Sequence, residues 1–263
     1  MGARRIVELT RQDNSYALRA AHSRRLIGHN RSMLAPRLMR LRRPPVLVNV
    51  PGRFVPECVS LDEVDARWQA LCAENERFFD GPMVHVLGVS RNGHGGVQIH
   101  VQECSYRFYA VQKTGLDCGV RPLGVKGITF ARDEAGVVRV LVGQRSARVA
   151  FYPRAWEFVP GGGLEPLAAP AEFVQRELRE EAGLSALHTP IAIALLYDPC
   201  ATTWEIVHRL EVDARDIPQL GWEYEQFAFV EPEQMPHPRA SVADQMMPLA
   251  CAVTRVCSSP QAE

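Results

Sequence analysis

Three glutamates stand within one short segment whose other residues predict a helix. Glu177 precedes Glu180 by three positions and Glu181 by four, so on a helix all three carboxylates can point into one small volume. Like charges at this spacing repel one another, and a bound divalent cation would neutralise them. Carboxylate oxygens are ligands that Mg²⁺ and Mn²⁺ prefer. The spacing favours a metal site, and a solvated acidic helix face is the alternative.

The residues around these glutamates indicate how they are positioned. Gly161–Gly163 can turn sharply and approach a ligand closely because they carry no Cβ. Pro170 is typical of a helix start, and Gly183 of a left-handed C-terminal cap. Val174 and Leu178 belong to an apolar stripe between them. The segment therefore predicts a glycine-rich loop followed by a helix with one buried face.

The segment 162–184 resembles the signature box of the Nudix hydrolases. Its second half matches in full, through Arg176, Glu177, Leu178, Glu180, Glu181, Gly183 and Leu184. One position departs, because the isolated Glu of the family pattern falls on Ala168. Glu165 and Glu172 are the nearby acids that could compensate for it.

This resemblance implies an α/β fold and a phosphorus-directed hydrolase. The expected architecture is a Nudix α/β/α sandwich with a mixed sheet over residues 120–263, preceded by a smaller α+β domain over residues 1–119. The expected reaction is hydrolysis of the diphosphate bond of a nucleoside diphosphate linked to another moiety, with Mg²⁺ or Mn²⁺ as cofactor. The family attacks phosphorus with water, and the metal lowers the pKa of bound water.

The resemblance also implies roles for individual residues. The metal ligands would be the Gly161 carbonyl, Glu177, Glu180 and Glu181, with the last two as the main ligands. Glu177 is either a ligand through water or the general base, and Glu225 is the rival base. Arg176 would orient a neighbouring carboxylate in the catalytic site.

Arginines just before the box are candidates for binding the diphosphate. Arg145 and Arg154 could do so through bidentate hydrogen bonds, as could Arg148. Arg145 is favoured because it ends a strand that should approach the box. The alternative for each is a solvated surface charge.

The substrate is the least determined feature. The domain order is similar to that of the UDP-glucose pyrophosphatase branch of the family, because an N-terminal α+β region ends in Ser105 to Tyr109 and is followed by Pro122 to Val125. This similarity favours a nucleotide sugar as the substrate. Pro199, fifteen positions beyond Leu184, resembles the ADP-ribose pyrophosphatase pattern and keeps ADP-ribose as the alternative. A non-catalytic, nucleotide-binding regulatory domain is the third possibility, since the box lacks its isolated Glu.

Composition narrows the class of protein. The chain is neutral overall, but residues 1–53 hold twelve arginines against two acids, so the remainder carries the opposite charge. The first segment lacks the lysines and interleaved aromatics typical of a nucleic-acid surface. Seven cysteines without a Cys-x-x-Cys pair indicate a reducing compartment, by default the cytoplasm. The expected partner is a nucleoside diphosphate-linked small molecule rather than nucleic acid or a membrane, and a homodimer is left open.

Periodicity and turn signals predict the remaining elements. Helices are expected over residues 16–26, 31–41, 61–79 and 243–256, the third with Ser60 as its cap. Strands are expected over residues 46–50, 83–89, 96–109, 123–131, 137–144, 156–158, 190–197, 204–212 and 227–230. Asn92-Gly93 is a hairpin signal between two of these strands.

Overall fold

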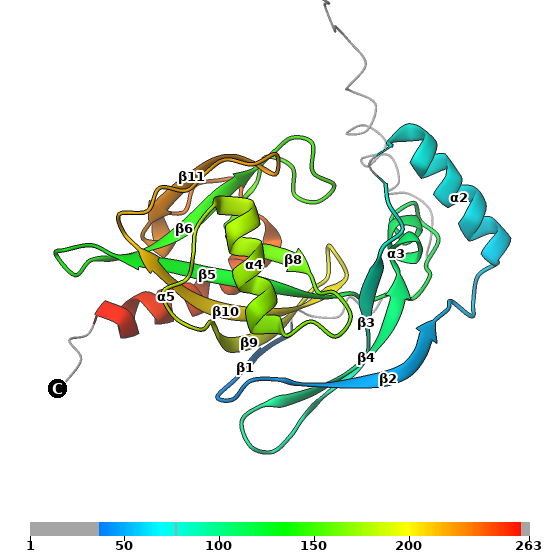
Figure 1. The fold of residues 1–263 in the computed structure, drawn as a ribbon, viewed down its shortest axis with the longest axis horizontal. Helices are drawn as coiled ribbons and strands as arrows, with labels where there is room; N and C mark the ends of the chain where they lie inside the picture. Colours follow the sequence, from blue (N-terminus) through cyan, green and yellow to red (C-terminus); the bar gives the residue numbers. More distant parts are fainter. Residues whose placement is uncertain (1–36, 77, 259–263) are drawn as a thin grey trace, which may run out of the picture. The chain divides into compact units, whose positions relative to one another are not determined.

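The computed structural model describes residues 37–76 and 78–258, which form a large and a small β-sheet with helices packed on them (Figure 1). In these residues the large sheet has eight strands: β1 (Arg37–Arg40), β5 (Leu123–Arg132), β6 (Val138–Arg145), β7 (Trp156–Phe158), β8 (Gly161–Gly163), β9 (Ile191–Asp198), β10 (Thr203–Asp213) and β11 (Tyr224–Val230). Their order is β1-β9-β10-β5-β6-β11, with β7 beside β6 and β8 beside β5. The sheet is mixed, because β10 and β5 run parallel whereas β9 and β10 run antiparallel.

Two helices cover opposite faces of the large sheet (Figure 1). Helix α4 (Pro170–Ala182) contributes Val174 and Leu178 to one core cluster, and α5 (Ser241–Ser258) contributes Met246 to another. These layers confirm the expected α/β/α sandwich with a mixed sheet. Among the described residues, no helix combines the length and the apolar character needed to cross a lipid bilayer.

The predicted bounds of α4 are confirmed. Pro170 occupies the first turn, where its missing N–H has no intrahelical partner to lose. Gly183 ends the helix with φ +67°, a left-handed conformation that costs other residues steric strain. Val174, Leu178 and Ala182 are spaced by four, so they lie on one face and are fully buried.

The small sheet contains β2 (Val46–Phe54), β3 (Pro82–Arg91) and β4 (Val97–Ser105), in the order β2-β4-β3. Helices α2 (Leu61–Glu74) and α3 (Tyr106–Gln112) accompany it, and a 3₁₀ turn, η1 (Pro232–Gln234), precedes α5. Strands β3 and β4 confirm the predicted hairpin.

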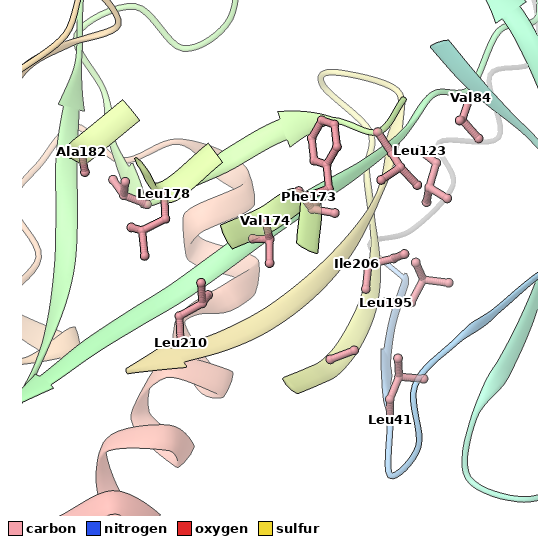
Figure 2. Close-up of a cluster of buried hydrophobic side chains, with 14 of the residues drawn as sticks. Leu41, Val84, Leu123, Phe173, Val174, Leu178, Ala182, Leu195, Ile206 and Leu210 are labelled. Carbon is pink, nitrogen blue, oxygen red and sulfur yellow. The ribbon is translucent and has the colours of Figure 1, made fainter. Parts of the chain in front are cut away.

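The two sheets share one apolar core. Figure 2 shows Leu41 and Val84, from the first part of the chain, in the same cluster as Leu123, Leu195 and the apolar face of α4. Strand β1 pairs with β9 and thereby extends the large sheet with residues from before position 120. The proposed domain division at residues 119 and 120 stays a prediction.

Four sequence predictions are wrong in the described residues. Residues 37–40 form a strand rather than the end of a helix, because β9 offers its edge to them; the remainder of that helix and the one over 16–26 lie outside the described residues. The strand expected to reach residue 109 ends at Ser105, because its partner β3 begins at Pro82, directly opposite. Helix α2 ends at Glu74, and the Ser60 side chain makes no capping hydrogen bond.

We expect Leu178→Ala to lower the free energy of unfolding by about 2–5 kcal/mol, because Leu178 is fully buried under α4 and its truncation leaves a cavity. Leu167→Ala is the matched control, since Leu167 is 85% exposed and should cost no more than about 0.5 kcal/mol. Urea unfolding curves would measure both. Equal losses in the two variants would contradict this account of the core.

Candidate active site

The three glutamates of α4 do not share one environment. Glu181 is buried and Glu177 is half-buried, whereas 63% of the Glu180 side chain is exposed. Glu177 and Glu181 are one turn apart and both face the glycine strand β8. Glu180 instead lies at the surface, 3.7 Å from the Arg176 Nε. The predicted convergence is therefore formed by two of the three carboxylates.

The close approach of the β8 backbone to the Glu177 carboxylate explains why residue 162 is a glycine. A Cβ added to Gly162 would lie 2.6 Å from the Cδ of Glu177 and as close to its Oε2. At Gly163 an added Cβ would meet nothing within 4 Å. Gly162 is therefore required by the position of Glu177, while Gly163 is not required by any such contact.

Glu181 is held from two directions. The Gly161 N–H donates to its carboxylate oxygens at 3.3 and 3.4 Å, and the Tyr224 hydroxyl lies 3.2 Å from Oε2. The same hydroxyl lies 3.0 Å from the Oε1 of Glu157. A phenol has one proton to donate, so it can serve only one carboxylate at a time. The arrangement suits a protonated Glu181 that donates to Tyr224 while Tyr224 donates to an ionised Glu157.

Glu157 is the buried anchor of this network. Lys126 Nζ lies 2.8 Å from its Oε2 and Arg145 Nη1 lies 2.5 Å from its Oε1. Burial alone would raise the pKa of Glu157, but the two cations outweigh burial and hold the pKa at about 2. Arg145 Nε also donates to the Phe151 carbonyl, which fixes the guanidinium between loop and strand.

Acidic side chains outnumber cationic side chains in this part of the molecule. The half-buried cations are Lys126 and Arg145, and the buried or half-buried acids around them include Glu157, Glu177, Glu181, Asp198, Glu205 and Glu223. Burial, and then the charge of Glu180, raises the pKa of Glu177 to about 7. Burial, and then the charge of Glu223, raises the pKa of Glu181 well above its usual value. This excess is the electrostatic condition for binding a divalent cation.

Glu157, Glu205 and Glu223 line a cleft of about 660 Å³, a volume typical of small-molecule sites. Glu177 and Glu181 are not in its lining, but the glycine strand that they face is. Its lining includes the glycine strand, Lys126, Arg145, Glu157 and Glu223. A larger groove of about 960 Å³ lies beside the start of α4, is lined mainly by prolines and small apolar residues, and has no Asp, Glu, Lys or Arg in its lining. The cleft rather than the groove holds the chemistry, so size alone does not identify the site.

The family model of the NUDIX domain matches residues 121–250. Residues 121–250 form a Nudix domain. The expected Nudix hydrolase fold is thus confirmed for this part of the chain. No curated protein matches the sequence significantly.

Several solved structures are similar to the Nudix domain. The MutT protein from Methanosarcina mazei Go1 has 19% identity and a TM-score of 0.42, and the similarity covers 51% of this chain and 96% of that one. The NUDIX domain of Shewanella oneidensis NrtR, solved with ADP ribose, has 17% identity and a TM-score of 0.41 over 52% and 89%. A C. elegans Ap4A hydrolase has 18% identity and a TM-score of 0.38 over 51% and 96%.

The metal ligands expected from the box are partly assembled in the Nudix domain. Glu177, Glu181 and the Gly161 backbone adjoin one another, while Glu180 lies at the surface. Among the described residues, no group of three or more His, Cys, Asp or Glu side chains is arranged to hold a metal ion. The donor chemistry nevertheless fits a hard divalent cation, because two carboxylates face the same glycine strand and further acidic side chains lie nearby.

The position of the missing box glutamate is filled by apolar packing. Ala168 packs against the apolar core, and its N–H donates to the Glu165 carbonyl. Glu165 accepts a hydrogen bond from Arg176 Nη2 at 2.7 Å and lines the cleft, whereas Glu172 is exposed in the first turn of α4. The carboxylate that Arg176 contacts most closely is therefore Glu165.

The predicted arginines and the rival base have different placements. Arg145 lines the cleft, but its guanidinium is engaged by Glu157. Arg154 is exposed, has φ +63°, and is absent from the cleft lining. Glu225 is exposed and accepts a hydrogen bond from the Ala147 N–H. Its neighbour two positions earlier, Glu223, is the acid of that loop that lines the cleft.

Sequence reasoning missed Lys126, Glu157 and Glu205 as site residues, and from the loop over residues 221–226 it favoured Glu225 rather than Glu223. A signal existed for two of them, because Lys126 and Glu157 are charged residues inside otherwise apolar strands. Burying an isolated charge is costly, so each such residue implies a partner of opposite charge. Their pairing with each other could not be inferred from the sequence, because 31 positions separate them along the chain.

We expect the pH dependence of stability to report on Glu177 in divalent-free buffer. Its pKa is about 7 in the folded protein and 4.5 without burial, so the folded state retains a proton that the unfolded chain loses as pH rises. The free energy of unfolding should therefore fall between about pH 4.5 and 7 and stay reduced above this window. Glu177→Gln should remove this contribution.

The measurement is the difference in Tm between Glu177→Gln and the wild type at pH 5 and pH 8. We expect the variant to gain at pH 8 relative to pH 5. Glu172→Gln, an exposed change on the same helix, should show no such dependence. A difference for Glu177→Gln that is the same at both pH values would contradict the assignment.

Proposed function

We propose that the chain catalyses divalent-cation-dependent hydrolysis of the diphosphate bond of a nucleoside diphosphate linked to another moiety. The observation that carries this proposal is the pair Glu177 and Glu181 facing the glycine strand, with raised pKa values, beside a cleft that also holds cationic side chains. A nucleotide sugar such as UDP-glucose is the leading substrate and ADP-ribose the alternative. Both rest on the sequence patterns described above.

Glu177, Glu181 and the Gly161 carbonyl would hold Mg²⁺ or Mn²⁺, with Glu180 at the exposed rim of the same helix. When bound, such an ion neutralises phosphate oxygens and lowers the pKa of a coordinated water. The raised pKa values of both buried carboxylates also mean that binding the cation displaces protons.

Other residues of the chain orient Glu181 and offer a contact for the phosphate. Lys126 and Arg145 keep Glu157 ionised, and Tyr224 connects Glu157 to Glu181, so Glu181 is held in one orientation. Arg148 is exposed and lines the cleft, where it can pair with a phosphate oxygen.

Attack of water on phosphorus requires a group that takes its proton. Glu177 is the first candidate, as the alternative to its role as a ligand, because it is half-buried, faces the glycine strand and has a raised pKa in the absence of metal. Glu223 is the second candidate, since it is half-buried, has a raised pKa and lines the cleft. Glu225, exposed and bonded to Ala147, is third.

The test of this function is turnover by the purified protein with Mg²⁺ over UDP-sugars, ADP-ribose, dinucleoside polyphosphates and nucleoside triphosphates, with a coupled phosphatase to release phosphate from monophosphate products. We expect Glu181→Gln to lower turnover by at least ~10²-fold, because it removes one of the two carboxylates proposed to hold the cation. Glu172→Gln should stay within about twofold. No turnover on any substrate, or full turnover by Glu181→Gln, would overturn the proposal.

A second prediction uses adjacent glycines. Gly162→Ala should lower turnover ~10²-fold, because the new methyl group would displace the Glu177 carboxylate and small displacements at a site are costly. Gly163→Ala should be nearly silent, since nothing lies within 4 Å of its added Cβ. Turnover rates and Tm values would be compared for both. Equal activity losses would refute the claim that Gly162 is set by Glu177.

One further function has an observation in its favour. Ala168 packs against the core where the family pattern has a carboxylate, and Glu180 lies at the surface, both of which support a nucleotide-binding domain that does not hydrolyse. Tight nucleotide binding without turnover would select this alternative. A cytoplasmic location and a homodimer remain predictions of the sequence.

A further inference from the structure

The cleft has a second wall that lies outside the Nudix domain. Among its lining residues are Phe78, Phe79, Tyr106 and Tyr109, all of which precede residue 121. Phe79 is 77% exposed, an unusual state for so large an apolar side chain. Residues from before the matched domain therefore contribute an aromatic surface to the cavity that contains the candidate active site.

Ring contacts hold this wall in a defined shape. Phe78 stacks with Tyr106 at a centroid distance of 6.4 Å, and Tyr106 meets Tyr109 edge-on at 6.3 Å. Tyr109 in turn stacks on Phe151 of the Nudix domain at 6.0 Å. The series thus links α3 to the loop whose Phe151 carbonyl accepts a hydrogen bond from Arg145. Aromatic pairs of this kind favour specific geometries, which makes the wall a preformed surface.

Phe79 stands apart from this series and is oriented by the backbone beneath it. The Gly81 N–H donates to the Phe79 carbonyl, and the Tyr106 N–H donates to the Gly81 carbonyl, which ties the segment to the start of α3. A Cβ added to Gly81 would lie 3.3 Å from the Phe79 ring. The Phe79 ring therefore packs beside Gly81, in a segment held by backbone hydrogen bonds, and most of the Phe79 side chain is exposed to solvent.

The lining of the cleft combines two kinds of chemistry. Arg148 is exposed there and suits a phosphate oxygen, whereas the wall offers flat aromatic rings. A ligand that satisfies both carries a planar ring joined to a diphosphate. Nucleobases stack on aromatic side chains whatever their sequence identity, because every base has a π-face.

We propose that the nucleobase of the substrate stacks on Phe79, so that binding of the nucleoside is set by the aromatic wall of residues 78–109 rather than by the Nudix domain alone. This inference rests on the proposed function for the identity of the substrate. Phe79 is a binding residue and touches no reacting atom. Its loss should consequently act on KM and leave kcat unchanged.

The experiment compares Phe79→Ala with the wild type on the best nucleoside diphosphate substrate. We expect KM to rise by about 5- to 100-fold, the range found when a base loses its stacking partner, with kcat within about twofold. Phe79→Trp should restore KM, because it restores a flat ring. Leu87→Ala is the control, since Leu87 is a 47% exposed residue of β3 that does not line the cleft.

Binding without turnover separates this inference from the proposed function. Titration calorimetry on the Glu181→Gln background would measure UDP, ADP and inorganic pyrophosphate with and without Phe79→Ala. Weaker binding of UDP or ADP with unchanged pyrophosphate binding supports the stacking role, even if the protein proves not to hydrolyse. Unchanged UDP and ADP binding, no UDP or ADP binding at all, or an equal loss for pyrophosphate would overturn it.

Discussion

The structure of the candidate site depends on the burial of Glu157 between two cations. An ionised carboxylate in the interior is costly unless partners compensate, and Lys126 and Arg145 supply them from the two strands that flank β7 and β8. Tyr224 links Glu157 to Glu181, because its hydroxyl contacts both carboxylates. The orientation of the most buried box glutamate is thus set by residues outside the box.

A steric constraint complements this electrostatic one. Strand β8 pairs with β5 along one edge and faces α4 on the other side, so its backbone lies against the Glu177 carboxylate. A side chain at position 162 would displace the Glu177 carboxylate, so glycine there lets the helix approach the strand closely without moving it. Val174 and Leu178 pack tightly between α4 and the sheet and keep the helix close to β8. The stability of the core is thereby coupled to the geometry of the site.

The first part of the chain is integrated with this arrangement. Leu41 and Val84 share the core cluster that packs α4, and β1 extends the large sheet along β9 (Figures 1 and 2). The stack from Tyr106 through Tyr109 to Phe151 reaches the loop that anchors Arg145. Residues before the Nudix domain thus contribute to its apolar core and to the lining of its cleft.

The sequence by itself determined α4, because Pro170, Gly183 and the apolar spacing act through neighbouring turns of one helix. It also determined the hairpin at Asn92 and the strands of the sandwich other than β1 and β8, because their signals are equally local. Tertiary structure decided the rest. Residues 37–40 became a strand because a distant edge was open to them, and Glu180 differs from Glu181 because only one side of α4 faces the sheet. The pairing of Lys126 with Glu157 likewise follows from strand register, which no local pattern encodes.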